Sequence, residues 1–181
     1  MAKGCLDKLT GSMLTTCNVA PVGVSDLYLI YPEDVTLTFI SENQQISAIA
    51  FATGARSYRM EGYKQNIQVT AALRTLDASV RYDVSVKFKF PESSPFLGGR
   101  LRGGRLMNGK FYVLEIPYGS MDSDFNIWGV NVPLECTNIE YDSNANGKLI
   151  TVTLSAPEGS AGNNRITCSA AVKDSIIAKS V

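Results

Sequence analysis

Three arginines lie among glycines in the stretch GGRLRGGRL: Arg100, Arg102 and Arg105. Guanidinium groups on a glycine-rich backbone suit phosphate recognition, because both offer N–H donors to an anion. However, the stretch is not a G-x-x-x-x-G-K-[ST] loop, contains no G-x-G-x-x-G match and does not follow a strand of a βαβ unit. We therefore favour a second chemistry, in which these arginines pair with acidic groups of a neighbouring subunit.

Two aspartates, Asp122 and Asp124, stand two residues apart in the stretch SMDSDFN. This spacing loosely matches the start of a calcium loop, but the glycine and the glutamate that an EF-hand loop needs at its sixth and twelfth positions are missing. The pattern is more typical of a solvated acidic loop. We take Asp122 and Asp124, with the three arginines, as candidate inter-subunit contacts.

The chain contains no histidine, which excludes Ser-His-Asp and Cys-His catalysis. Carboxylate pairs, lysine and tyrosine remain as acid–base candidates. Glu115, Glu135 and Glu140 lie on or near expected strands, but the sequence alone does not bring two of them to glycosidase spacing. Trp128 is the single tryptophan that a carbohydrate platform could use. We expect no enzyme and no catalytic, cofactor or metal site.

Composition indicates a globular chain without a strong electrostatic field. The 181 residues suffice for one domain with a core, and 17 basic side chains balance 17 acidic ones, so nothing concentrates nucleic acid or favours an anionic membrane. The four cysteines are irregularly spaced, which favours buried free thiols over zinc ligands or disulfides. The chain lacks the roughly eighteen-residue apolar run of a membrane span and an apolar signal segment, so we expect it to be soluble and not exported.

Alternating apolar and polar residues dominate from residue 27 to residue 154 and predict β-strands. In RYDVSVKFKF, every second residue from Tyr82 to Phe90 is apolar, and NIQVTAAL repeats the design with Ile67, Val69, Ala71 and Leu73 inward. Further strands are expected in LYLIY, DVTLTF, QISAIAFAT, ARSYRMEGY, KFYVLEI, KLITVTLS and IWGVNVPLECTNIEY, the last bent near Pro133. Turns at YPEDV, ATGA, MNGK and NANGK separate them. The pattern predicts an antiparallel β-sandwich or barrel.

The remaining segments predict one short helix and two arms. Residues 93–109 open with Ser94 and Pro95 and end at Asn108-Gly109, which are helix start and stop signals, so we expect a short helix or helical turn there. We expect an N-terminal arm over residues 1–24, a β-sandwich core over 25–156 and a C-terminal segment or arm over 157–181. Such arms order best against neighbouring subunits.

The order of these features resembles that of tail tube proteins of tailed phages, particularly those of Bacteroidetes-type hosts. The resemblance covers residues 17 to 160. It rests on CNVAPVGVSDLYLIYPEDVTLTF, on RYDVSVKFKF before the helix-like segment, and on MNGKFYVLEIPYG followed by WGVNVPLECTNIEYDSNANGKLITVTLSAPEG. It implies a β-sandwich with one flanking helix, hexameric rings that stack, and inner strands that join into a continuous barrel through which DNA passes.

We therefore expect a structural protein of the virion, assembled in the host cytoplasm. Its partners would be further copies of itself and other tail or connector proteins, with DNA only as passing cargo and no membrane. Two alternatives remain open at this point. One is another ring-forming connector, neck or hub protein of a phage, and the other is a carbohydrate-binding β-sandwich module of a fibre.

Overall fold

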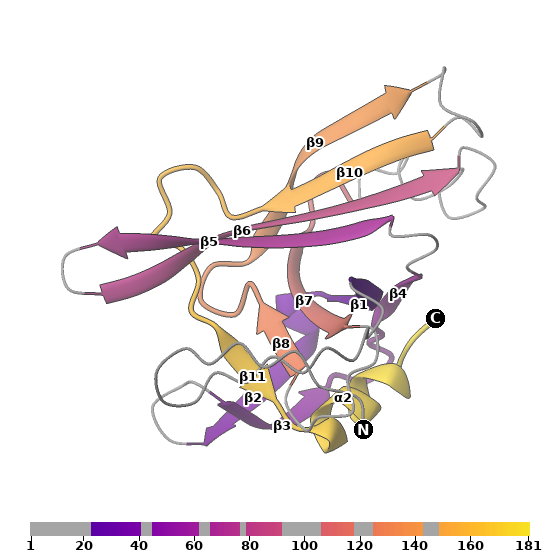
Figure 1. Ribbon diagram of the computed structural model, residues 1–181. Helices are drawn as coiled ribbons and strands as arrows, with labels where there is room; N and C mark the ends of the chain where they lie inside the picture. Colours follow the sequence, from indigo (N-terminus) through magenta and orange to yellow (C-terminus); the bar gives the residue numbers. More distant parts are fainter. Residues whose placement is uncertain are drawn as a thin grey trace, which may run out of the picture.

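The computed structural model describes residues 23–40, 45–61, 66–76, 79–91, 106–117, 125–142 and 149–181. These residues form two sheets and one helix (Figure 1). We call the four-stranded one the upper sheet; its strands in spatial order are β5 (Ile67–Leu76), β6 (Ser79–Pro91), β10 (Leu149–Ser155) and β9 (Leu134–Asp142). The fold is mainly β with a single short helix in the described part, as the alternation predicted.

The lower sheet has seven strands. In spatial order they are β4 (Tyr58–Glu61), β1 (Val24–Ile30), β7 (Lys110–Pro117), β8 (Phe125–Trp128), β11 (Ile166–Cys168), β3 (Gln45–Phe51) and β2 (Val35–Ile40). The first two residues of β7 also pair with β9, so one hydrogen-bonded path connects the two sheets. That path ends at β2 and β5, and the sheet is therefore not closed into a barrel within the described residues.

The first core lies between the two sheets. The upper sheet contributes Val84, Val86 and Phe88 from β6, each at most 2% exposed, and the lower sheet contributes Leu27 and Val113 among others. From Val84 to Phe88, every second residue of β6 is therefore buried, while Asp83, Lys87 and Lys89 face solvent. This is the arrangement that the alternation in RYDVSVKFKF predicts.

The second core lies on the opposite face of the lower sheet, beneath helix α2 (Ala170–Ile177) (Figure 1). Val172 and Ile176 of the helix pack with residues of β3, β8 and β11. Because cores cover both its faces, the middle of the lower sheet has consecutive apolar residues, as in Leu27 to Ile30, instead of alternation. The molecule therefore has three layers.

The C-terminal segment differs from the arm that we expected over residues 157–181. Ile166 and Cys168 of β11 are fully buried, and Thr167 pairs with Gln45 of β3 in parallel, which also departs from an all-antiparallel sheet. The helix covers the second core, and the backbone of Val181 donates to Ser57. The segment therefore belongs to the folded body. Residues 1–22 of the arm expected over 1–24, and residues 93–105 of the helix or helical turn expected over 93–109, lie outside the described residues.

Several predicted local features are confirmed. The bend near Pro133 is a complete break between β8 and β9, with Gly129 in a left-handed conformation at its start. The stretch YPEDV contains the 3-10 helix η1 (Pro32–Asp34) and leads directly into β2. The turns at ATGA and MNGK also lie where predicted, whereas the turn in NANGK lies outside the described residues.

Candidate functional site

The five candidate contact residues lie outside the described residues. Arg100, Arg102 and Arg105 precede the turn at Leu106 to Gly109, and Asp122 and Asp124 precede β8. In both cases a buried residue follows directly, since Leu106 is 6% and Phe125 is 3% exposed. The structure does not describe the five side chains themselves, and their role as inter-subunit contacts stays a prediction.

The three strand glutamates do not converge on one site. Glu135 of β9 forms an ion pair of 3.3 Å with Lys110, at the start of β7, whereas Glu115 lies five residues further along that strand. At about 3.3 Å per residue, this separation is about 16 Å along the strand. Paired glycosidase carboxylates lie about 5 to 9.5 Å apart. Glu140 accepts a bond of 2.7 Å from Asn138 on the exposed face of β9. The arrangement does not suit carboxylate-pair catalysis.

Trp128 is a core residue. Its side chain is 4% exposed, its ring lies edge-on to Tyr82 at 6.0 Å, and its Nε1 donates a hydrogen bond of 2.8 Å to Glu115. Asn126 also donates to Glu115 and accepts from Arg165. A stacking platform for a sugar needs an exposed ring. The structure therefore gives no support to a carbohydrate site centred on Trp128.

The structure describes two of the cysteines: Cys136 is a partly buried free thiol, and Cys168 is fully buried in the second core. Burial raises the pKa of the Cys136 thiol, and a backbone hydrogen bond of Asn138 opposes that rise only in part. A raised pKa leaves less thiolate, the reactive form, at neutral pH. Cys136 is therefore poorly suited to act as a nucleophile.

Among the described strands, β5 and the part of β9 from Cys136 onward each have one neighbour only, and these two open edges of the upper sheet carry exposed apolar side chains. On β5, Leu73 pairs with Tyr82 and is 63% exposed, although the alternation predicted Ala71 and Leu73 inward. The prediction of burial is wrong because the β5–β6 hairpin extends beyond the lower sheet, to the left in Figure 1. At the other edge Tyr141 of β9 is 52% exposed. Both residues belong to the sheet face that elsewhere covers the first core.

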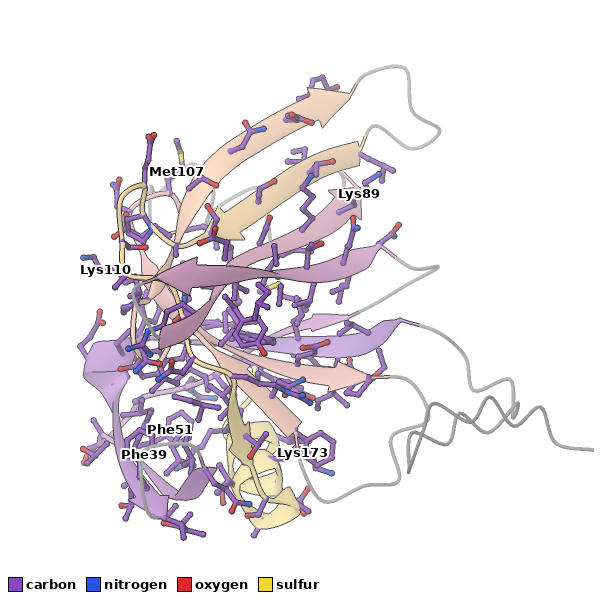
Figure 2. The ribbon with its side chains drawn as sticks, turned by 60° about the vertical axis from the view of Figure 1, so that its left-hand side comes forward. Phe39, Phe51, Lys89, Met107, Lys110 and Lys173 are labelled. Atoms are coloured by element: carbon purple, nitrogen blue, oxygen red, sulfur yellow. The ribbon has the colours of Figure 1, made fainter. Side chains whose placement is uncertain are left out.

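The opposite face of the upper sheet is polar. Lys87 and Lys89 of β6 lie opposite Thr153 and Thr151 of β10 in the strand register, and Lys87 lies opposite Gln68 of β5. Figure 2 shows Lys89 on this sheet, far from Phe39 and Phe51 on the β2–β3 hairpin. Hydroxyl, amide and ammonium groups therefore form a broad hydrophilic surface between the two open edges.

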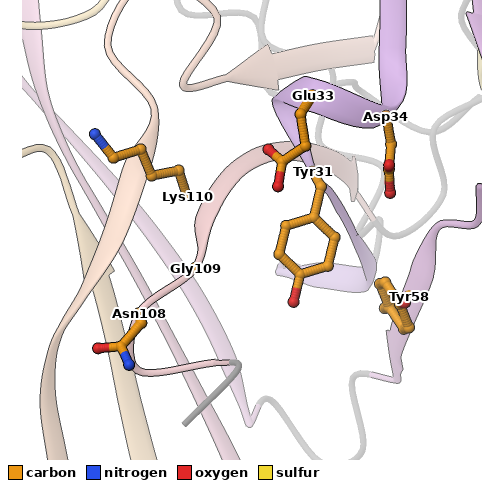
Figure 3. Close-up of a pocket in the computed structure, with 7 residues that line it drawn as sticks. All are labelled: Tyr31, Glu33, Asp34, Tyr58, Asn108, Gly109 and Lys110. Atoms are coloured by element: carbon orange, nitrogen blue, oxygen red, sulfur yellow. The ribbon is translucent and has the colours of Figure 1, made fainter.

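A pocket of about 580 Å³ forms between the turn around η1, the start of β4 and the MNGK turn, and the sequence patterns did not predict it. It is lined by Tyr31, Glu33, Asp34, Tyr58, Asn108, Gly109 and Lys110 (Figure 3). The rings of Tyr31 and Tyr58 meet edge to face at 5.8 Å, and Tyr31 also packs on Phe111 at 5.0 Å. The stretches YPEDV and MNGK were interpreted only as turns. Their aromatic and acidic residues were the available signal.

The described residues offer neither a cluster of metal ligands nor a helix that could span a membrane. Within the described ranges, no group of three or more Cys, Asp or Glu residues is arranged to hold a metal ion. The helix that the structure describes is too short to cross a membrane. No family model, no curated protein and no solved structure matches this chain.

Proposed function

We propose that this chain is a structural subunit that self-assembles into rings, and that the rings stack into the tube of a phage tail. The observation that carries the proposal is the pair of open edges of the upper sheet. In the described part of the chain, β5 pairs only with β6, and β9 from Cys136 onward pairs only with β10. A monomer that leaves long edges open is prone to pair with other copies.

The two open edges also offer matching chemistry. Leu73 at one edge and Tyr141 at the other are large apolar residues exposed on the same face of the sheet. Leu73 aligns with Tyr82 of β6 and Tyr141 aligns with Phe90, eight residues further along, so a contact between the β5 edge of one copy and the β9 edge of the next brings the two together when the strands are offset. Such a head-to-tail contact uses two different surfaces and produces a ring when its rotation closes.

The polar face of the upper sheet would then line the lumen. It carries Lys87, Lys89, Thr151 and Thr153, and the chain as a whole has equal numbers of acidic and basic side chains. DNA that slides through a conduit must meet a hydrated surface without a strongly basic groove, because phosphate contacts hold DNA in a salt-dependent way. This surface fits passage of DNA as cargo.

Substitution at the β5 edge tests the proposal. Leu73→Lys should abolish or strongly weaken assembly in sedimentation velocity, because a charge would enter the apolar contact. Ala72→Lys is the matched control: Ala72 is also exposed but lies on the opposite, polar face of the same strand. Assembly unaffected by Leu73→Lys would argue against the edge contact, and equal loss in both variants would show that added charge alone is responsible.

A connector, neck or hub ring remains the second candidate, because the same edge contact closes a single ring. It differs in that its rings do not stack.

A further inference from the structure

The pocket between η1, β4 and the start of β7 combines aromatic rings with two carboxylates. Tyr31 and Tyr58 form an edge-to-face pair, and Glu33 and Asp34 stand beside it on η1. Figure 3 shows the Glu33 carboxylate beside the ring of Tyr31, with Tyr58 on the other side of that ring. The faces of tyrosine rings attract cations, and carboxylates accept hydrogen bonds from the N–H groups of cations. The two kinds of group thus favour the same class of ligand.

The one ammonium group in the pocket lining does not neutralise the two acids. Lys110 Nζ lies 3.3 Å from Glu135 Oε1, outside the pocket, and Figure 3 shows the Lys110 amino group turned away from Tyr31. Since Glu135 balances Lys110, Glu33 and Asp34 leave the pocket with an excess of negative charge. An organic cation would complement that charge.

A guanidinium group fits this lining better than an ammonium group. It is planar, so it can stack on a tyrosine ring while its N–H groups bond to a carboxylate in the ring plane. The pocket opens on the surface and Glu33 is exposed, so a side chain from outside can reach it. An arginine side chain therefore complements the negative charge of the pocket, can stack on a tyrosine ring and can enter from the surface.

We propose that this pocket binds an arginine side chain presented by a second copy of the chain. The choice of a second copy rests on the proposed function, whereas the preference for guanidinium rests on the pocket alone. Charge complementarity supports the choice, because copies with zero net charge do not repel one another and each presents an exposed guanidinium group at Arg56. Pairing of this kind fixes the register of copies in an assembly.

The preference for guanidinium is tested first on dilute, unassembled protein. The full chain is titrated with N-acetyl-arginine amide and, separately, with N-acetyl-citrulline amide, which has nearly the same shape without the charge. We expect saturable NMR shifts at the Tyr58 and Gly109 amides with the arginine compound only, and their loss in the Glu33→Gln/Asp34→Asn variant. Absent shifts, or equal shifts with both compounds, overturn the assignment of the pocket.

Assembly of the full chain tests whether a second copy supplies the arginine. Glu33→Gln/Asp34→Asn should raise the protein concentration needed for assembly at least tenfold, while Glu158→Gln, which removes an exposed acid elsewhere, should not change it. Circular dichroism checks that both variants fold. If the double variant assembles like the wild type, a second copy is not the occupant. If the wild type itself never assembles, the proposed function and the second copy both fail, while the titration still decides the ligand class.

Discussion

The indole Nε1 of Trp128 donates a hydrogen bond of 2.8 Å to the Glu115 carboxylate, across the neighbouring strands β7 and β8. These two residues were separate candidates for chemistry in the sequence, one as a sugar platform and one as a catalytic acid. In the folded chain the indole N–H and the carboxylate are hydrogen-bond partners at the edge of the first core. Their contact is structural.

Trp128→Phe should therefore destabilise the fold. It removes buried volume and leaves the half-buried Glu115 carboxylate without its indole donor, which together predict a loss of about 2 to 4 kcal/mol in the free energy of unfolding. Glu115→Gln keeps an acceptor for the indole and should cost about 1 kcal/mol. Urea denaturation measures both, and a Trp128→Phe variant as stable as the wild type would contradict this role.

Gly129 allows the chain to break between β8 and β9. Its φ is +89°, and an added Cβ would lie 2.6 Å from the Phe111 carbonyl oxygen. Gly159 has a similar φ of +76° with open space around it. Gly159→Ala should thus cost only backbone strain, about 1 kcal/mol, and Gly129→Ala at least about 2 kcal/mol more. Equal thermal unfolding midpoints for the two variants would refute the close approach.

The C-terminal helix should contribute to the stability of the whole chain. Ile176 is fully buried in the second core, so Ile176→Ala should lower the free energy of unfolding by about 2 to 5 kcal/mol. Ile177 is only partly buried, and Ile177→Ala provides a matched control with a smaller loss. If chemical denaturation shows no loss for Ile176→Ala, the segment behaves as the arm that the sequence suggested.

Stability should fall in strong alkali because of two tyrosines. Burial raises the pKa of Tyr28 and Tyr112 above the ordinary 10.0; at Tyr28 the Arg59 charge opposes the rise and Asp26 adds to it. The unfolded chain then releases these protons first, so the stabilisation is complete below pH 10 and is lost as pH rises through the raised values. Tyr28→Phe/Tyr112→Phe should reduce the fall in unfolding free energy between pH 9 and 11, relative to each protein's own value at pH 7. An unchanged fall would exclude these phenols as its source.

The arginines and aspartates outside the described residues remain candidate contacts. Arg100→Gln/Arg102→Gln/Arg105→Gln should weaken assembly, as judged by sedimentation, without changing the unfolding midpoint of the monomer. Arg165→Gln, which removes one exposed guanidinium that already bonds to Asn126 within the chain, is the control. Glu33→Gln/Asp34→Asn is then added to the triple variant. If the addition causes no further loss of assembly, these arginines supply the side chain that enters the pocket. Unimpaired assembly of the triple variant would remove them as contacts.

Alternation in the sequence predicted most strands because one face of each is buried. It did not show how far burial extends, so Leu73 was expected inside although its hairpin extends beyond the core. The strand β11 was missed because it has three residues and pairs with Gln45 and Ile46, far away in the chain. A signal for α2 did exist: Val172 and Ile176 are four residues apart, after Ser169 at the N-cap. The aromatic and acidic residues of the pocket were visible in the sequence, but their meeting in one pocket was not, because segments distant in sequence form it.

Electron microscopy of the purified full chain tests the central claim most directly. We predict ring-shaped particles that stack into tubes as the protein concentration rises, with the Leu73→Lys variant remaining monomeric under the same conditions. Single rings that never stack would favour a connector or neck protein. A wild-type chain that stays monomeric at every concentration would contradict the account.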